Sequence, residues 1–306
     1  MIENKIYRSP LFYVGDKFKL IKQIKQYFPD NIKNFIEPFT GGGSVFLNTN
    51  AKKFLLNDID KNIINLHKFL TSQSINKSCF FKKLEEQIFK YDLSYSYKTD
   101  YISQELKEKY KKTYYAHYNK EAFKKLKVDF NNNKTDILKL YILLIYGFNR
   151  MIRFNLKGDY NLPVGNVDFN ANVFNALNDY LSLITTKNIK FYNLDYKDFI
   201  NSIKITQDDF IYIDPPYLIT CSEYNKYWDI QKEKNLLDLI NHLNKKNIKF
   251  ALSNVIHYKC KTNNILKHWA DDNKYNIFPI KSNYISYHDN SKKDFLEVLI
   301  TNYEKS

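Results

Sequence analysis

The feature that most constrains the fold of this 306-residue chain is a short pattern near its start. Residues 34–37 are mostly apolar and end in a carboxylate, a glycine triplet occupies 41–43, and Ser44 is suited to cap a helix. A second apolar run, 54–58, also ends in an acid, and residues 59–70 then show helical periodicity. Strand, glycine turn, helix, strand and acid in this order predict a nucleotide-binding βαβ unit within an α/β fold.

This alternation stops near residue 72 and resumes near residue 169. In between, residues 136–146 predict a strongly apolar helix, and residues 151–163 predict two short strands around the turn at Gly158. We therefore expect one α/β domain that is split by a helical insertion carrying a β-hairpin. In the resumed pattern, further strands are expected at residues 189–192, 210–213, 248–252 and 295–300.

The charge of the chain is strongly positive, with 47 Lys and Arg against 33 Asp and Glu, or +14 net. This charge suits nucleic acid or an anionic surface, but AT-rich coding, which enriches lysine, asparagine, isoleucine and tyrosine together, explains it equally well. Cys79, Cys221 and Cys260 form no CxxC pair, which favours a reducing compartment. The sequence shows no signal peptide and no apolar run of about 18 residues. We therefore expect a soluble cytoplasmic protein without a membrane partner.

The glycine triplet has two interpretations. Glycine lets a ligand approach the backbone where a Cβ would collide. The segment does not match GxGxxG, and no lysine follows it as in a phosphate-binding loop, so a ligand without phosphate is favoured. Asp58, at the end of the next strand, is placed to accept hydrogen bonds from a ribose diol. A structural turn followed by a helix-capping acid explains the same residues equally well.

Asp214-Pro215-Pro216-Tyr217 directly follows the expected buried strand at 210–213. Two prolines cannot continue a strand ladder, so the tetrapeptide forms a rigid loop at the carboxyl edge of the sheet, where ligands bind in open α/β folds. The loop offers carbonyl acceptors, a carboxylate and a flat ring. The exocyclic amino group of a purine requires two acceptors and a stacking surface. The alternative is a proline-terminated strand with a surface aspartate.

The order of these two motifs resembles that of the amino-group DNA methyltransferases that use S-adenosylmethionine. Residues 39–43 precede residues 214–217, which is the order in Dam-type adenine-N6 enzymes, the D12 class or α group, whose target-recognition region lies between the two. Residues 13–17 are similar to the family's N-terminal aromatic-x-Gly-Gly-Lys motif, with Asp16 where a second glycine is usual. The resemblance spans nearly the whole chain, because similar segments also occur at residues 148–155, 158–165, 252–254 and 297–302.

The resemblance implies a role for particular residues. The catalytic residues would be Asp214, Pro215, Pro216 and Tyr217. The cofactor pocket would be lined by Tyr13, Lys17, Phe39, Gly41, Asp58, Asp195 and Asp214. Residues 1–72 and 169–306 would form the Rossmann-like methyltransferase domain, and residues 73–168 the target-recognition domain.

The same resemblance implies an activity. The methyl group of S-adenosylmethionine would be transferred to N6 of an adenine flipped out of double-stranded DNA. Tyr217 would stack on the adenine, while the Asp214 carboxylate and the Pro215 carbonyl accept the two amino hydrogens. A GATC-like target and a cognate restriction endonuclease as partner are the corresponding expectations, and the oligomeric state is left open.

The scarcity of arginine bears on recognition, because Arg8, Arg150 and Arg153 are the only arginines in the chain. Arginine pairs bidentately with guanine O6 and N7, which lysine cannot match, so arginines kept in the expected hairpin indicate base reading. A surface or phosphate-contacting role is the alternative. The resemblance favours Arg153 as base reader, and Phe12 stands where related enzymes often carry a DNA-reading lysine. The expected DNA-recognition residues are Asn149, Arg150, Met151, Arg153, Asn155 and Pro163.

Other functions remain open from the residues alone. RNA or a protein amide is a second class of acceptor, since related Pro-Pro-Tyr motifs serve there, although the insertion with its hairpin favours duplex DNA. A DNA-binding module without catalysis is a third, and the complete motif set counts against it. The six histidines are scattered without metal-ligand spacing, so no metal site is expected.

Overall fold

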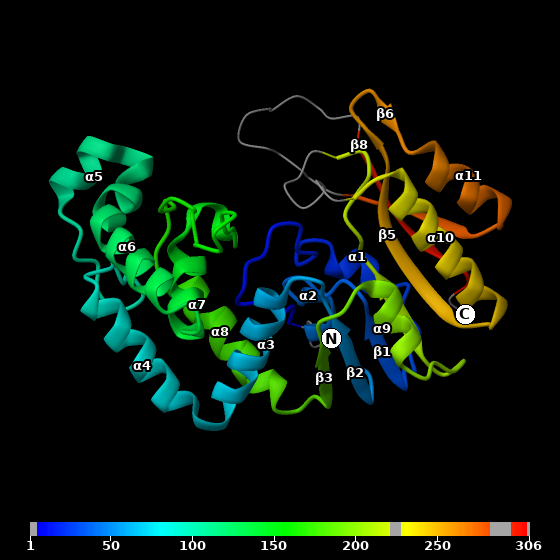
Figure 1. Cartoon of the computed structure of the whole chain (residues 1–306), viewed down its shortest axis with the longest axis horizontal. Helices are drawn as coiled ribbons and strands as arrows, with labels where there is room; N and C mark the ends of the chain where they lie inside the picture. Colours follow the sequence, from blue (N-terminus) through cyan, green and yellow to red (C-terminus); the bar gives the residue numbers. More distant parts are fainter. Residues whose placement is uncertain (1–4, 221–227, 282–294, 305–306) are drawn as a thin grey trace. The chain divides into compact units, whose positions relative to one another are not determined.

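A computed structural model of the chain describes residues 5–220, 228–281 and 295–304. The chain divides into two compact units, each assembled from separate stretches of sequence (Figure 1). The first unit contains residues 1–16, 41–47 and 60–186, and the second contains residues 17–40, 48–59 and 187–306.

The second unit is built on one sheet whose described strands are ordered β3-β2-β1-β4-β5-β8-β7, with β6 paired to β5. The strands from β3 to β5 in this order run parallel, and β8 is antiparallel to both of its neighbours. The strands are β1 Asn34–Glu37, β2 Lys53–Asn57, β3 Ile189–Tyr192, β4 Phe210–Ile213, β5 Lys249–Tyr258, β6 Lys261–Thr262, β7 Asn276–Ile280 and β8 Phe295–Thr301. The expectation of an α/β fold with a mostly parallel sheet is confirmed.

The central strands of this sheet are apolar and almost entirely buried. All four residues of β4 are buried, and β1 is buried from Phe35 onward. Ile36, Ile211 and Phe250 belong to one hydrophobic cluster that also includes residues of the helices beside the sheet. The helices of this unit are α1 Ile21–Lys25, α9 Tyr196–Ser202, α10 Ile230–Lys245 and α11 Asn264–Asp272.

The first unit is helical. Its most apolar helix, α7, is buried from Leu140 to Tyr146 and contacts α3, α4 and α6 (Figure 1). The α-helices are α2 Ser44–Leu47, α3 Lys61–Gln73, α4 Lys77–Lys90, α5 Gln104–Tyr110, α6 Tyr114–Asn132, α7 Ile137–Tyr146 and α8 Ala171–Ile184, with short 3-10 turns at Ser74–Asn76, Lys111–Thr113 and Phe148–Arg150. Within the described ranges, no helix is both long and apolar enough to cross a membrane.

The segment expected to form a hairpin makes two antiparallel bridges, Gly147↔Val164 and Phe154↔Tyr160, instead of a continuous ladder. The Phe154↔Tyr160 bridge is closed by two backbone hydrogen bonds, from the Asn161 N–H to the Arg153 carbonyl at 3.1 Å and from the Asn155 N–H to the Asp159 carbonyl at 2.9 Å. In such a pair the backbone groups of Tyr160 point away from Phe154. They bind α6 instead, where the N–H donates to the Asn131 Oδ1 at 2.8 Å and the carbonyl accepts from the Asn131 Nδ2 at 3.2 Å.

Candidate active site and nucleic-acid interface

Four acidic residues lie at or just beyond the carboxyl ends of the four adjacent parallel strands of the second unit. Glu37 ends β1, Asp58 follows β2, Asp195 lies shortly after β3, and Asp214 follows β4. The strand order reverses between β1 and β4, and ligands of open α/β sheets bind at such a switch point. The sheet therefore places Glu37 and Asp214 on adjacent strands at the expected ligand edge.

Asp214 is held by two groups on its two oxygens. The Lys17 ammonium lies 2.7 Å from its Oδ2, and the Tyr217 hydroxyl donates to its Oδ1 at 2.9 Å. The side chain of Lys17 is only 3% exposed, and its ammonium lies 5.1 Å from the centre of the Tyr217 ring. Two motifs separated by about 200 residues of sequence thus meet directly, and the buried lysine is charge-paired as its burial requires.

A second carboxylate, the buried Glu297 of β8, joins this group. Its Oε1 accepts from the Tyr217 hydroxyl at 3.2 Å and lies 4.0 Å from the Lys17 ammonium. Glu297 is 1% exposed. From the sequence, residues 297–302 only resembled a segment of the methyltransferase family, and the contact between Glu297 and Tyr217 was not predicted.

Glu37 is a third carboxyl at this edge, and it is buried. Burial, together with the negative charges of Asp214 and Asp58, raises the pKa of Glu37 well above its usual range, and Lys17 opposes this shift. Its Oε2 atom is buried and has no hydrogen-bond partner among the described residues. An unsatisfied buried polar atom points to a missing ligand or water. The sequence contained a signal for Glu37, since it is the carboxylate that ends the first buried strand.

Three aromatic side chains of the second unit, Phe39, Tyr196 and Trp228, pack together. The Phe39 ring centre is 5.3 Å from that of Tyr196 and 5.8 Å from that of Trp228. Asp195 caps α9 by accepting from the N–H of Lys197 at 2.9 Å, which fixes the start of the helix that carries Tyr196. Tyr196 and Trp228 were not identified from the sequence, although Tyr196 directly follows a predicted cofactor residue.

Tyr13 and Gly41, the remaining predicted cofactor residues, lie together in the first unit. A Cβ on Gly41 would lie 3.4 Å from the Tyr13 ring, and one on Gly42 would lie 2.8 Å from the Tyr13 Cβ. The glycine triplet therefore allows the Tyr13 segment to pack closely against it. The Gly41 carbonyl lies 2.9 Å from the Nε2 of His67, a buried residue of α3.

Residues 148–165, which we call the recognition segment, are fixed by their own side chains. Asn155 accepts with its Oδ1 from the N–H groups of Lys157 and Asp159, both at 2.9 Å, and so holds the turn. Tyr160 is 1% exposed and its hydroxyl donates to the Leu143 carbonyl at 3.1 Å. The structure thus gives Asn155, a predicted DNA-recognition residue, a clear structural role within the segment.

The three arginines all lie in the first unit. The Arg8 and Arg150 guanidinium carbons lie 4.5 and 4.0 Å from the centre of the Phe12 ring. Burial first, and then the Arg8 charge, lower the pKa of Arg150 to about 10. Asn149 and Arg150 both have left-handed backbones, with φ of 53° and 50°. The Arg153 Nε donates to the Asn161 Oδ1 at 2.9 Å. The shared aromatic contact brings Arg8 to the recognition segment.

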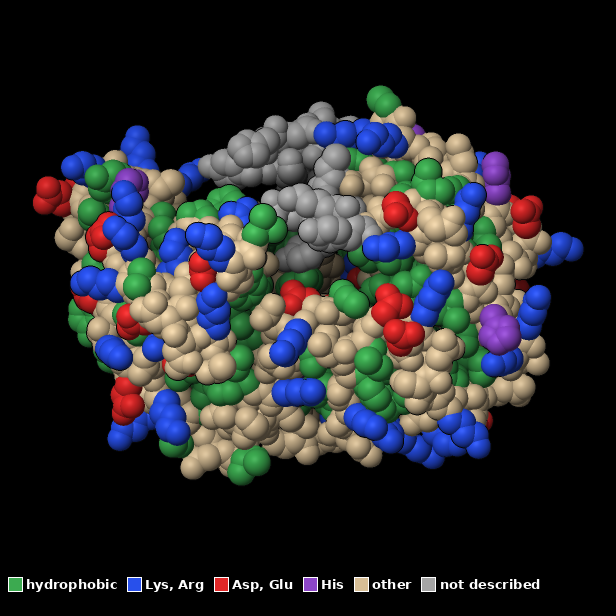
Figure 2. All heavy atoms as spheres, viewed as in Figure 1, with side chains coloured by type: hydrophobic (Ala, Val, Ile, Leu, Met, Phe, Trp, Pro, Cys, Tyr) green, Lys and Arg blue, Asp and Glu red, His purple; other side chains and the backbone are tan. Residues whose placement is uncertain are grey.

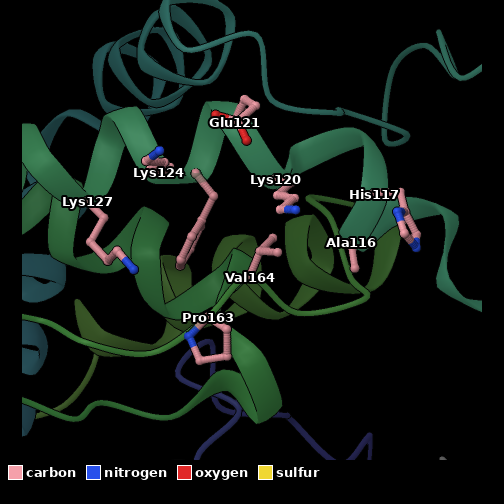
Figure 3. Close-up of a pocket in the computed structure, with 9 residues that line it drawn as sticks. Ala116, His117, Lys120, Glu121, Lys124, Lys127, Pro163 and Val164 are labelled. Atoms are coloured by element: carbon pink, nitrogen blue, oxygen red, sulfur yellow. The ribbon is translucent and has the colours of Figure 1, made fainter.

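A lysine-lined hollow of about 550 Å³ lies between α6 and the end of the recognition segment (Figure 3). We call it the lysine groove; it is lined by Ala116, His117, Lys120, Glu121, Phe123, Lys124, Lys127, Pro163 and Val164. Three lysines of one helix thus line the same hollow as Pro163, another predicted DNA-recognition residue. Elsewhere, Lys and Arg side chains are spread over the visible face with acids between them, so overall charge does not mark a single surface (Figure 2).

Comparison with known proteins defines the class. The sequence pattern of the D12 class N6 adenine-specific DNA methyltransferases matches residues 13–286, and the chain belongs to this family. The matched range includes both Lys17 and Asp214, whereas Glu297 lies beyond its last residue.

Individual relatives are consistent with this family. The chain is 36% identical to the modification methylase StsI of Streptococcus sanguinis and 35% identical to the type II methyltransferase M.FokI of Planomicrobium okeanokoites, over 98% of its length in both cases. It covers only 44% and 43% of those proteins, less than half of each. It is 23% identical to the DNA adenine methylase of Escherichia coli K12, over 81% of this chain and 80% of that protein.

Proposed function

We propose that this chain transfers a methyl group from S-adenosylmethionine to N6 of adenine in double-stranded DNA. The observation that carries the proposal is the Asp214-Pro215-Pro216-Tyr217 loop, which follows β4 at the switch point of the sheet and meets Lys17 of the other family motif. Family membership supports the same reaction.

The residues of the second unit fit this cofactor. It carries a sulfonium and an ammonium, and the acids at the carboxyl edge outnumber the one buried lysine, which suits a cationic ligand. Asp58 is placed to accept from the ribose hydroxyls, and the rings of Phe39 and Tyr196 offer an apolar surface for adenine. When bound, the cofactor supplies an electrophilic methyl group on a positively charged sulfur.

The loop residues then act on the target base. Flipping the adenine out of the duplex costs a few kcal/mol, and stacking on the Tyr217 ring offsets part of that cost. The Asp214 carboxylate and the Pro215 carbonyl accept the two N6 hydrogens and leave the nitrogen lone pair directed at the methyl carbon. Once N6 carries the methyl group in place of the cofactor sulfur, Asp214 would be placed to take up the proton that N6 gives up and to pass it to solvent.

DNA binding is assigned to the first unit. The lysine groove would contact phosphates, and Arg150, Met151 and Arg153 would face the bases. Because the StsI relative is named a modification methylase, we propose that the protein protects a specific DNA site against a cognate restriction endonuclease in the cytoplasm. The Dam-type resemblance is the ground for proposing that this site is GATC-like.

The test is incubation with labelled S-adenosylmethionine and plasmid DNA free of adenine methylation, followed by nucleoside analysis and sequencing of methylated sites. We expect N6-methyldeoxyadenosine at one recurring site. Asp214→Ala should abolish transfer, whereas Asp209→Asn, which alters a buried carboxylate at the opposite end of β4, should retain it. Label in RNA or protein instead of DNA, or normal turnover by Asp214→Ala, would contradict the proposal.

A further inference from the structure

We propose that Glu297 is a positioning residue, which accepts the Tyr217 hydroxyl hydrogen bond and thereby frees the Asp214 carboxylate to accept from the substrate amino group. This inference rests on the proposed methyl transfer. It assigns a task to a β8 residue that lies outside both motifs of the site.

The inference starts from the occupancy of Asp214. Its Oδ1 accepts from Tyr217 at 2.9 Å and its Oδ2 pairs with Lys17 at 2.7 Å, so both oxygens already bind a donor. A substrate N–H that approaches the carboxylate competes with these donors for its charge. Asp214 would therefore accept from the substrate more readily if Tyr217 or Lys17 could bind a different acceptor.

Tyr217 has such an acceptor. Its hydroxyl lies 2.9 Å from Asp214 and 3.2 Å from the Glu297 Oε1, and a phenol carries a single proton, so it donates fully to only one of them at a time. The two distances differ by a few tenths of an ångström, and a small rotation of the hydroxyl is enough to transfer the hydrogen bond from Asp214 to Glu297.

The position of Glu297 suits this task because it is rigid. Glu297 lies within β8, paired with Val255 of β5 on one side and with Ile280 of β7 on the other. The strand residues that follow it are buried. The Lys17 ammonium lies 4.0 Å from its Oε1 and closer to Asp214, at 2.7 Å.

The inference is tested by a double-mutant cycle with Glu297→Gln and Tyr217→Phe, measured as single-turnover methyl transfer and as cofactor affinity by calorimetry. Glu297→Gln keeps the shape but removes the charge, and we expect transfer to slow about tenfold, the size of a charge-assisted hydrogen bond, with cofactor affinity changed less than about twofold. In the Tyr217→Phe background, which has no hydroxyl to relocate, Glu297→Gln should slow transfer less than about twofold.

Several results would overturn the proposal. An equal loss from Glu297→Gln in both backgrounds would show that Glu297 acts independently of the hydroxyl. A loss of cofactor affinity as large as the loss of rate would make it a binding residue. Asp209→Asn controls for the general effect of changing a buried carboxylate in this sheet. If the wild-type protein transfers no methyl group, the proposed function is wrong and this inference is wrong with it. If it does transfer methyl groups, the double-mutant cycle alone decides whether Glu297 is a positioning residue.

Discussion

His67 should make the stability of the protein fall as the pH drops below neutral. This side chain is fully buried on α3, and burial lowers its pKa from 6.5 to about 4. Its Nε2–H is suited to donate to the Gly41 carbonyl at 2.9 Å, and its Nδ1 to accept from the Tyr180 hydroxyl at 3.1 Å. The neutral ring thus forms both hydrogen bonds. A second proton, on Nδ1, would point at the Tyr180 hydroxyl, which would then have to accept a hydrogen bond instead of donating one.

The size of the effect follows from the two pKa values. In the unfolded chain the ring takes up a proton as the pH falls through 6.5, whereas the folded protein resists protonation until about pH 4. The stabilisation is therefore complete above about pH 6.5 and is lost progressively toward pH 4. A difference of 2.5 between 6.5 and 4 corresponds to about 3 kcal/mol in the free energy of unfolding.

The assay is urea unfolding of the wild type and of His67→Gln at several pH values between 4 and 8. The difference between the two free-energy curves cancels the carboxylates that titrate in the same range. We expect this difference to shrink by about 3 kcal/mol from pH 7 to pH 4, because only the wild type loses the histidine contribution. His268→Gln, at an exposed position of α11, serves as the matched control. Parallel curves for wild type and His67→Gln would refute the reasoning.

Two further predictions concern the first unit. Replacing the three lysines of the lysine groove by Gln should weaken DNA binding and lower the slope of log Kd against log salt concentration by about 0.9 for each phosphate that is no longer neutralised. Lys125→Gln, on the same helix, is the control and should leave this slope unchanged. An unchanged slope in the triple variant would exclude the groove from the DNA interface. Gly147→Ala should lower the free energy of unfolding by about 1–3 kcal/mol, since a Cβ there would lie 2.5 Å from the Tyr160 hydroxyl and 2.6 Å from the Leu143 carbonyl. Thermal unfolding measures this, and a wild-type Tm would contradict the close approach.

The sequence determined the α/β architecture because the signals for it are local. Apolar runs, the glycine triplet and a proline pair identify strands, a turn and a strand end from a few neighbouring residues each. The order of the motifs along the chain also indicated the family, which the comparison confirmed. The contact between Asn131 of α6 and the backbone of Tyr160 was not predicted, because it joins a helix side chain to a segment 29 residues further along the chain and leaves no local pattern.

Only the tertiary structure decided which side chains share the site. Lys17, Asp214 and Glu297 are far apart in sequence, and their contacts arise because a loop, β4 and β8 bring them to one edge of the sheet. Likewise, only the folded segment shows that the side chain of Asn155, a predicted DNA contact, also holds a turn. Local periodicity in the sequence specifies the helices and strands. The environment of each side chain, however, depends on contacts between elements that are distant in sequence. That environment determines which carboxylate oxygens accept hydrogen bonds and which pKa values shift.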